Sequence, residues 1–164
     1  KVLFPAEVLP IVTVLANMVH FFLGLPILII FLVYYRHAIN LADLAWFPLV
    51  VVTQLLLTVG LALIVSALTV HFRDLKDLVS NLLTFWFFAT PIIYPMTMAP
   101  GVGKRMLNAN PFTHLAVSYQ EILFFNGPFG HWKWLLVIGA VSLAMFAIGY
   151  WLFDRLRDSF AEVV

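Results

Sequence analysis

The segment His71-Phe-Arg-Asp-Leu-Lys-Asp-Leu-Val79 is a short cluster of charges between two long stretches that contain none. The second stretch includes Phe85-Trp-Phe-Phe-Ala-Thr-Pro-Ile-Ile-Tyr-Pro95, in which two prolines follow a run of aromatic residues. Charge at this density is too costly to place in hydrocarbon, so the cluster predicts a water-facing turn between two membrane spans. Proline interrupts a helix, and a span that only anchors a protein has no need of a break. The two segments together favour transport over anchoring.

The composition indicates a protein that lies in a lipid bilayer. Of 164 residues, 63% are hydrophobic and 10% are charged, whereas ordinary soluble domains carry about 25% charged residues. A helix needs about 20 apolar residues to cross roughly 30 Å of hydrocarbon. We predict an all-α, polytopic membrane protein with one transmembrane domain over residues 1–164, and an interruption of its first span at Gly24 and Pro26. Its four transmembrane helices are expected in the windows without Asp, Glu, Lys or Arg: Val8–Tyr35, Leu44–Phe72, Leu78–Gly103 and Trp134–Phe153.

Residues 96–131, between the last two windows, are predicted to form a loop on the outer side, and the first part of it, residues 96–106, is expected to lack a helix. Asn110-Pro111 predicts the start of a short helix, with asparagine as the cap and proline at the first helical position. Asn126-Gly127-Pro128 predicts its end. About 16 residues reach only about 24 Å, so we expect a re-entrant or interfacial helix.

The distribution of lysine and arginine predicts the orientation. Four spans place both ends of the chain on the same side of the membrane, together with the charged cluster at residues 71–77. Short loops on the cytoplasmic side carry the higher density of basic residues. The side that holds the chain ends has the higher density and is predicted to be cytoplasmic: its basic residues are Lys1, Arg73, Lys76, Arg155 and Arg157, against Arg36, Lys104, Arg105 and Lys133 on the other side.

The sequence offers no recognisable catalytic or metal site. It contains no cysteine, no histidine pair at the spacing of HExxH and no GxxxxGK[ST] phosphate loop. A net charge of +1 without a long basic run does not indicate nucleic-acid binding. His114, Ser118 and Glu121 share one face of the predicted short helix. A nucleophile with its base is conceivable there, but a polar face on a water-filled vestibule explains the three residues more simply.

The aromatic residues and the charged cluster each allow two interpretations. Aromatic residues near the broken span form either a belt at the headgroup level or flat surfaces on which the CH-rich faces of sugars stack, and composition alone favours the belt. The charged cluster at residues 71–77 is either a solvated loop or a docking surface whose mixed charges set the register of a cytoplasmic partner.

Three motifs then bear a family resemblance: His71-Phe-Arg-Asp-Leu-Lys-Asp-Leu78, Thr90-Pro-Ile-Ile-Tyr-Pro-Met96 and Asn108-Ala-Asn-Pro-Phe112. In this order and spacing they resemble the permease subunit of ABC-2 type exporters, in the branch that exports lipid-linked polysaccharides such as O-antigen, capsule and teichoic acid precursors. Residues 1–10 are similar to the family's segment before its third span. Family permeases have six spans after an amphipathic helix. The resemblance therefore implies a fragment that lacks this helix and the first two spans.

The resemblance also implies roles for individual residues. Residues 1–7 and the cytoplasmic loop 71–77 would contact the ATPase and couple it to transport, through Lys1, Phe4, Pro5, Glu7, Phe72, Arg73, Asp74 and Lys76. The broken span and the short helix would form the substrate path and outer gate. The residues implied there are Phe85, Trp86, Phe88, Pro91, Tyr94, Pro95, Asn110, Pro111, Tyr119 and Glu121. Within this family, sugar stacking becomes as favoured as the aromatic belt.

The implied protein is a multi-pass permease in the cytoplasmic membrane of a bacterium, and not an enzyme. Its expected partners are a separate ATP-binding cassette subunit, which would use ATP and Mg²⁺, a second permease copy, membrane lipids and a lipid-linked polysaccharide. No cofactor is expected on this chain. The alternatives are an ABC-2 exporter of a lipid or drug, and a glycolipid-modifying membrane enzyme that uses Glu121 and His114. A non-catalytic scaffold is disfavoured, because it would have no evident use for the broken span.

Overall fold

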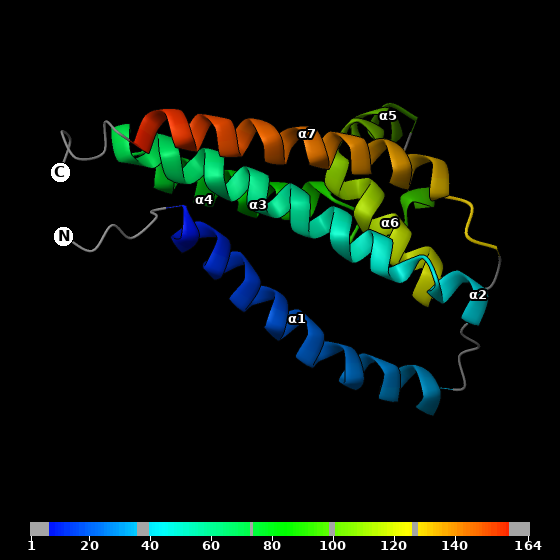
Figure 1. Cartoon of the computed structure of the whole chain (residues 1–164). Coiled ribbons are helices and arrows are strands. Elements are labelled where there is room, and N and C mark those ends of the chain that lie inside the picture. Colours follow the sequence, from blue (N-terminus) through cyan, green and yellow to red (C-terminus); the bar gives the residue numbers. More distant parts are fainter. Residues whose placement is uncertain (1–6, 36–39, 73, 99–100, 126–127, 158–164) are drawn as a thin grey trace.

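The computed structural model describes residues 7–35, 40–72, 74–98, 101–125 and 128–157. Within them the chain forms helices and no strand (Figure 1). Three helical segments, which contain α1, α3 and α7, are long and apolar enough to cross a membrane. The prediction of a polytopic helical membrane protein is confirmed. The elements are α1 (Val8–Tyr34), α2 (Leu41–Leu44), α3 (Phe47–His71), α4 (Leu75–Ala89), η1 (Met96–Met98), α5 (Gly101–Ala109), α6 (Pro111–Leu123) and α7 (Trp132–Leu156).

α3 and α7 form the central helix pair and approach one another most closely at two glycines. A Cβ atom added to Gly60 of α3 would lie 2.7 Å from the backbone carbon of Met145 and from the backbone nitrogen of Phe146. A Cβ atom added to Gly149 of α7 would collide with the backbone of Gly60. Small residues allow such contact between helix backbones in membranes, where packing rather than the hydrophobic effect holds helices together.

Two clusters of buried side chains lie along this pair. One joins the first half of α3 to α6 and to the start of α7, and includes Val50, Leu57, Leu115, Ile122 and Leu135. The other joins α1 to the second half of α3 and to the end of α7, through Val14, Val59, Leu63, Ala67 and Phe153. α3 therefore connects both halves of the molecule, and α6 belongs to one half only.

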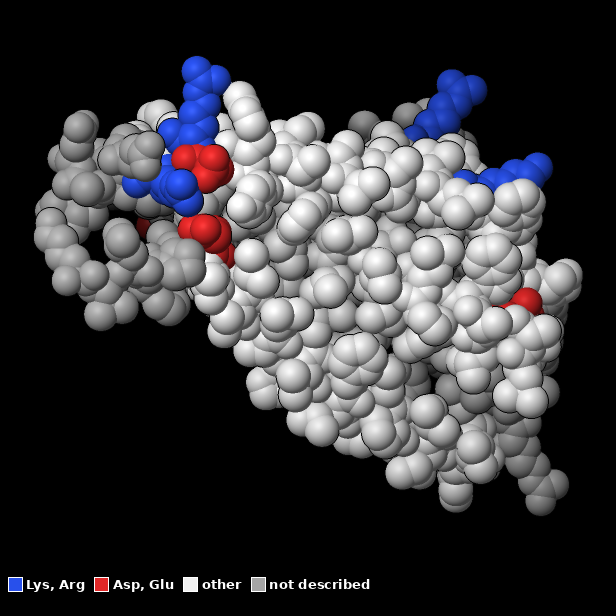
Figure 2. All heavy atoms as spheres, viewed as in Figure 1, with Lys and Arg blue, Asp and Glu red and all other residues white. Residues whose placement is uncertain are grey.

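α1 begins and α7 ends at the same end of the bundle (Figure 1). An oxygen of Glu7 lies 3.8 Å from a guanidinium nitrogen of Arg157, as expected if both chain ends lie on one side of the membrane. At the opposite end, the carboxylate of Asp43, in α2, accepts a hydrogen bond from the backbone nitrogen of Phe129, shortly before α7. Figure 2 shows Lys, Arg, Asp and Glu gathered near these two ends, with an uncharged band between them.

The predicted span at Leu78–Gly103 is not one long helix, so the described part of the chain has three long spanning helices and not four. α4 has 15 residues and reaches only about 22 Å. It ends at Ala89, because the residue before a proline is driven out of helical backbone, and Thr90, before Pro91, is extended at φ −102° and ψ 136°. α3 ends and α7 begins at opposite ends of the bundle (Figure 1). The chain between them returns along the bundle through α4 and the non-helical segment that follows it.

Other local predictions had mixed outcomes. The side chain of Asn110 caps α6 by accepting from the backbone nitrogen of Phe112, as the Asn110-Pro111 pattern predicted. The absence of a helix in residues 96–106 was wrong, because most of this stretch lies in η1 and α5. The interruption of the first span was also wrong, since α1 continues through Pro26.

Candidate functional site

The candidate site is the junction at which the broken end of α4 is bound to α6, which we call the α4–α6 seam (Trp86, Thr90, Pro91, Asn110 and Gln120). Asn110 uses both side-chain atoms to make it. Its Oδ1 accepts from the indole nitrogen of Trp86 at 2.9 Å, in addition to capping α6, and its Nδ2 donates to Oγ1 of Thr90 at 3.0 Å. One amide thus starts α6 and binds it to the end of α4.

Two further hydrogen bonds pair backbone carbonyl groups that the break in α4 leaves without a helical partner. The carbonyl groups of the last turn of a helix have no N–H donor within that helix, and an unpaired carbonyl in hydrocarbon is costly. Nε2 of Gln120 donates to the carbonyl oxygen of Pro91 at 2.7 Å. Thr90 donates its hydroxyl to the carbonyl of Trp86 at 2.8 Å. Thr90 and Pro91 are both buried, so these bonds stabilise a break in the middle of the structure.

A cavity of about 500 Å³ lies beside the seam and reaches α1 and α3. Its wall is mostly apolar and aromatic, with a few hydrogen-bonding groups, which is the usual character of a small-molecule site. The hydroxyl of Tyr119 donates to Oε1 of Gln54 at 2.6 Å across this wall. The residues that line the cavity include Phe21, Gln54, Trp86, Phe112, Tyr119 and Gln120.

A second cavity of about 670 Å³ lies against α4 and α5. Its wall includes Phe85, Trp86, Tyr94, Met98 and Asn110. Trp86 lines both cavities, so its indole, fixed by Asn110, stands between them. A movement of Trp86 would therefore be the simplest way to join the two spaces.

The structure brings several predicted path residues together. Trp86, Pro91 and Asn110 form the seam, and Tyr119 and Tyr94 line the two cavities. Phe85 lines the second cavity although it is largely exposed, and Pro95 lies beside Tyr94 on a shallower surface. Pro111 occupies the first position of α6.

Two predicted path residues lie away from these cavities. Phe88 is 61% exposed and borders only a shallow surface on α4. Glu121 points to the segment before α7, where its Oε2 accepts from the backbone nitrogens of Gly130 and His131 at 3.1 and 3.0 Å. The expected place of Phe88 and Glu121 in a path along the seam therefore finds no support in the geometry.

The arrangement of His114 and Ser118 also disfavours the enzymatic alternative. The hydroxyl of Ser118 donates to the backbone carbonyl of His114 at 2.7 Å, and not to its imidazole. That imidazole instead contacts the carbonyl of Asn108 and the ring of His131. A nucleophile must lie within hydrogen-bond reach of its base, and these two side chains are not arranged in that way.

The residues predicted to contact an ATPase are only partly described. Lys1, Phe4, Pro5 and Arg73 lie outside the described residues. Glu7 lies beside Arg157 at the end of the bundle, and one of its carboxylate oxygens is buried. Three further residues, Phe72, Asp74 and Lys76, are exposed around the start of α4.

Comparison with known proteins gives the family. The sequence model described as "ABC-2 type transporter" matches residues 4–124, which include α1, α3, α4 and the α4–α6 seam. The chain belongs to the ABC-2 type transporter family. This ABC-2 chain is 39% identical over its whole length to the "O-antigen export system permease protein RfbA" of Myxococcus xanthus, of which it covers 63%. Two Klebsiella pneumoniae proteins of the same name are 29% and 30% identical, with 62% of each covered.

The ABC-2 chain thus spans less than two thirds of the length of these relatives. The family and the relatives' names describe components of transporters and not enzymes. Together with the three apolar helices, they make this chain a multi-pass membrane component of a transporter.

Three polar residues of the site were not predicted: Gln54, Thr90 and Gln120. Gln54 is a polar residue in a largely apolar helix, which is a signal for a buried function, but its partner Tyr119 is distant in sequence. Thr90 precedes Pro91 and so had to leave the helix, although nothing local indicated its bond to Asn110. The partner of Gln120 is the backbone carbonyl of Pro91, and a pattern of side chains does not predict a bond to backbone.

Proposed function

We propose that this chain is part of the permease subunit of an ATP-driven ABC exporter, which moves a lipid-linked polysaccharide of the O-antigen type across the inner membrane of a bacterium. The names of the three relatives support this substrate class. A separate ATP-binding subunit would hydrolyse ATP with Mg²⁺, and a second copy of the permease would complete the pore. Residues 1–7 and 71–77 would face the cytoplasm and receive the ATPase.

The observation that carries the proposal is the broken passage at the α4–α6 seam. A closed helix would fill this position with its own side chains. The break instead leaves cavities of about 500 and 670 Å³ on either side of Trp86. Aromatic faces with a few amide and hydroxyl groups suit a sugar chain, since rings supply broad contact area and polar groups fix orientation. Phe112 lies edge-on to Trp86, with ring centroids 6.1 Å apart, which extends the aromatic surface.

Replacing Trp86 and Tyr94 by leucine, singly in the full-length permease, is expected to reduce export of polymer about tenfold or more. A loss of about 1.4 kcal/mol of transition-state stabilisation accounts for that factor, and aromatic contacts of this size are common. The measurement is the amount of polysaccharide at the cell surface, normalised to permease in the membrane. Trp151→Leu is the matched control, because Trp151 is exposed on α7 at the other end of the bundle.

The same pair of variants separates polymer export from export of a lipid or drug. Tyr94→Leu is the cleaner of the two, since Trp86 also bonds to Asn110. A polymer path should lose transport in Tyr94→Leu at normal membrane abundance. Unchanged polymer export in both variants would contradict the proposed path.

Replacing Asp74 and Lys76 together by alanine is expected to uncouple the ATPase from export. Both side chains are exposed at the start of α4, so their loss should change stability by no more than about 0.5 kcal/mol. The expected result is ATP hydrolysis that no longer responds to substrate, with polymer retained inside the cell. Lys104→Ala with Arg105→Ala, on exposed residues of α5 at the opposite end, should leave coupling intact. Normal export by the Asp74 and Lys76 double variant would exclude the docking role.

A further inference from the structure

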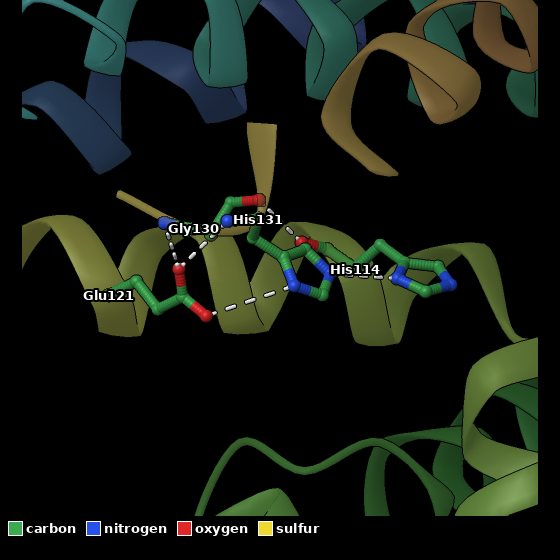
Figure 3. Close-up of polar contacts among 5 residues, drawn as sticks. His114, Glu121, Gly130 and His131 are labelled. Carbon is green, nitrogen blue, oxygen red and sulfur yellow. Dashed lines mark hydrogen bonds and ion pairs between the residues drawn. The ribbon is translucent and has the colours of Figure 1, made fainter. Parts of the chain in front are cut away.

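A partly buried group of titratable side chains lies where α6 meets the segment before α7, outside the α4–α6 seam (Figure 3). His114 of α6 is 2% exposed. Its Nδ1 lies 2.9 Å from Nε2 of His131, and its Nε2 lies 2.9 Å from the carbonyl oxygen of Asn108. On the other side of the His131 ring, Nδ1 lies 3.8 Å from Oε1 of Glu121.

These contacts determine where each proton lies. The carbonyl of Asn108 only accepts, so Nε2 of His114 carries a hydrogen and donates. A neutral imidazole has a single N–H, so Nδ1 of His114 accepts, and Nε2 of His131 must be the donor. A neutral His131 then presents the bare Nδ1 to an oxygen of Glu121. Nδ1 of His131 and Oε1 of Glu121 are then two acceptors that face one another at 3.8 Å. A proton between them would turn this contact into a hydrogen-bonded pair.

We propose that His114, His131 and Glu121 form a binding site for one additional proton, held on Nδ1 of His131 against the carboxylate of Glu121. The position of Glu121 is fixed by its other oxygen, which accepts two backbone hydrogen bonds from Gly130 and His131. Binding the proton turns a contact between two acceptors into an ion pair.

The surroundings keep this site empty near neutral pH. Burial, and after it the adjacent His114, lowers the pKa of the His131 imidazole to about 4. The ring of Trp134 stacks on His114 with centroids 4.4 Å apart, which shields the pair from water. Other charged groups around it are Asp43 of α2, bound to the backbone of Phe129, Lys133 of α7, whose ammonium lies over the Trp132 ring, and the exposed Lys104 and Arg105 of α5.

The lowered pKa of His131 determines how the stability of the protein changes with pH. The unfolded chain binds a proton on His131 near its ordinary pKa of about 6.5, and the folded chain binds it only at lower pH. Between these values the unfolded state holds more protons, so the contribution of His131 to stability decreases as the pH falls through that range. The site fills only at the acid end of the range.

The test is ¹⁵N nuclear magnetic resonance of histidine-labelled protein in nanodiscs, because imidazole nitrogen shifts report each proton directly. At pH 7 we expect the proton of His114 on Nε2 and that of His131 on Nε2. On acidification, Nδ1 of His131 should gain a proton with a midpoint at least one pH unit below 6.5. A midpoint near 6.5, or a His114 ring protonated on Nδ1 at pH 7, would overturn the proposal.

Glu121→Gln separates the carboxylate from the general effect of burial. The glutamine amide can donate to the bare Nδ1 and carries no charge, so the midpoint of His131 should fall by a further pH unit or more. Glu7→Gln is the matched control, since Glu7 lies at the opposite end of the bundle beside Arg157, and it should leave the midpoint unchanged. An unchanged midpoint in Glu121→Gln would contradict the role of this carboxylate, and the wild-type titration tests the site without any variant.

Discussion

Replacing Gly149 or Gly60 by alanine is expected to separate α3 from α7 and to deplete folded protein from the membrane. The added Cβ atom of either residue would meet backbone and not a side chain: that of Gly60 lies 2.7 Å from backbone atoms of Met145 and Phe146. Backbone cannot rotate away, so the helices must move apart along their whole contact. Overpacking of this kind costs about 1–3 kcal/mol or more per site, against a total stability of only about 5–15 kcal/mol.

The measurement is the thermal unfolding temperature of the purified protein, together with its abundance in the membrane. Gly24→Ala is the matched control, because Gly24 lies within α1 and a Cβ atom there has no neighbour within 4 Å. Alanine is the better helix former by about 1 kcal/mol, so this control should be neutral or stabilising. Equal unfolding temperatures for Gly24→Ala, Gly60→Ala and Gly149→Ala would show that the α3–α7 contact is looser than described.

Replacing Asn110 by alanine should open the α4–α6 seam and abolish export. The variant loses the cap of α6, worth about 1 kcal/mol, and its bonds to Trp86 and Thr90, worth about 0.5–1.5 kcal/mol each. It also leaves the indole nitrogen of Trp86 without its acceptor. The expected destabilisation is therefore about 2–4 kcal/mol, and Trp86 becomes free to move between the two cavities.

Asn110→Asp shows which of these bonds matters. Aspartate keeps an oxygen for the cap and for Trp86 but replaces the donor to Thr90 with an acceptor and adds a charge. It should therefore retain more export than alanine if the bond to Trp86 holds the seam. The measurements are the unfolding temperature and the shift in Trp86 fluorescence, read in a variant that lacks the other tryptophans. If the alanine and aspartate variants behave alike, the bond to Trp86 does not hold the seam together.

Much of the fold could be predicted because its causes are local. The three long helices follow from the cost of charge in hydrocarbon, which acts on each window separately. Asn110-Pro111 predicted the start of α6 because a cap involves only the next residues. Pro91 likewise predicted the break in α4. The uncharged window Leu78–Gly103 continues beyond α4, because apolar composition extends through Ile92 and Ile93 although the helix has already ended at Ala89.

The site itself was only partly predictable. Trp86, Tyr94 and Tyr119 were expected in a path on family resemblance, and they line the cavities. Phe88 was expected there on the same resemblance, yet it borders a shallow surface on α4, because adjacent residues of a helix point in different directions. Glu121 was expected in the substrate path or outer gate, and this role stays a prediction; its carboxylate accepts hydrogen bonds from the segment before α7.

By itself, the sequence determined that the chain crosses a membrane as helices, where the charged turn lies, and where α4 breaks and α6 begins. Only the tertiary structure decided that Trp86 bonds to Asn110, 24 residues away, that Gly60 meets Gly149, and that His114 meets His131. The physical reason lies in the solvent. In lipid nearly every face of a helix is apolar, so hydrophobic periodicity does not tell which face packs inward, and close contact between small or polar groups makes that choice.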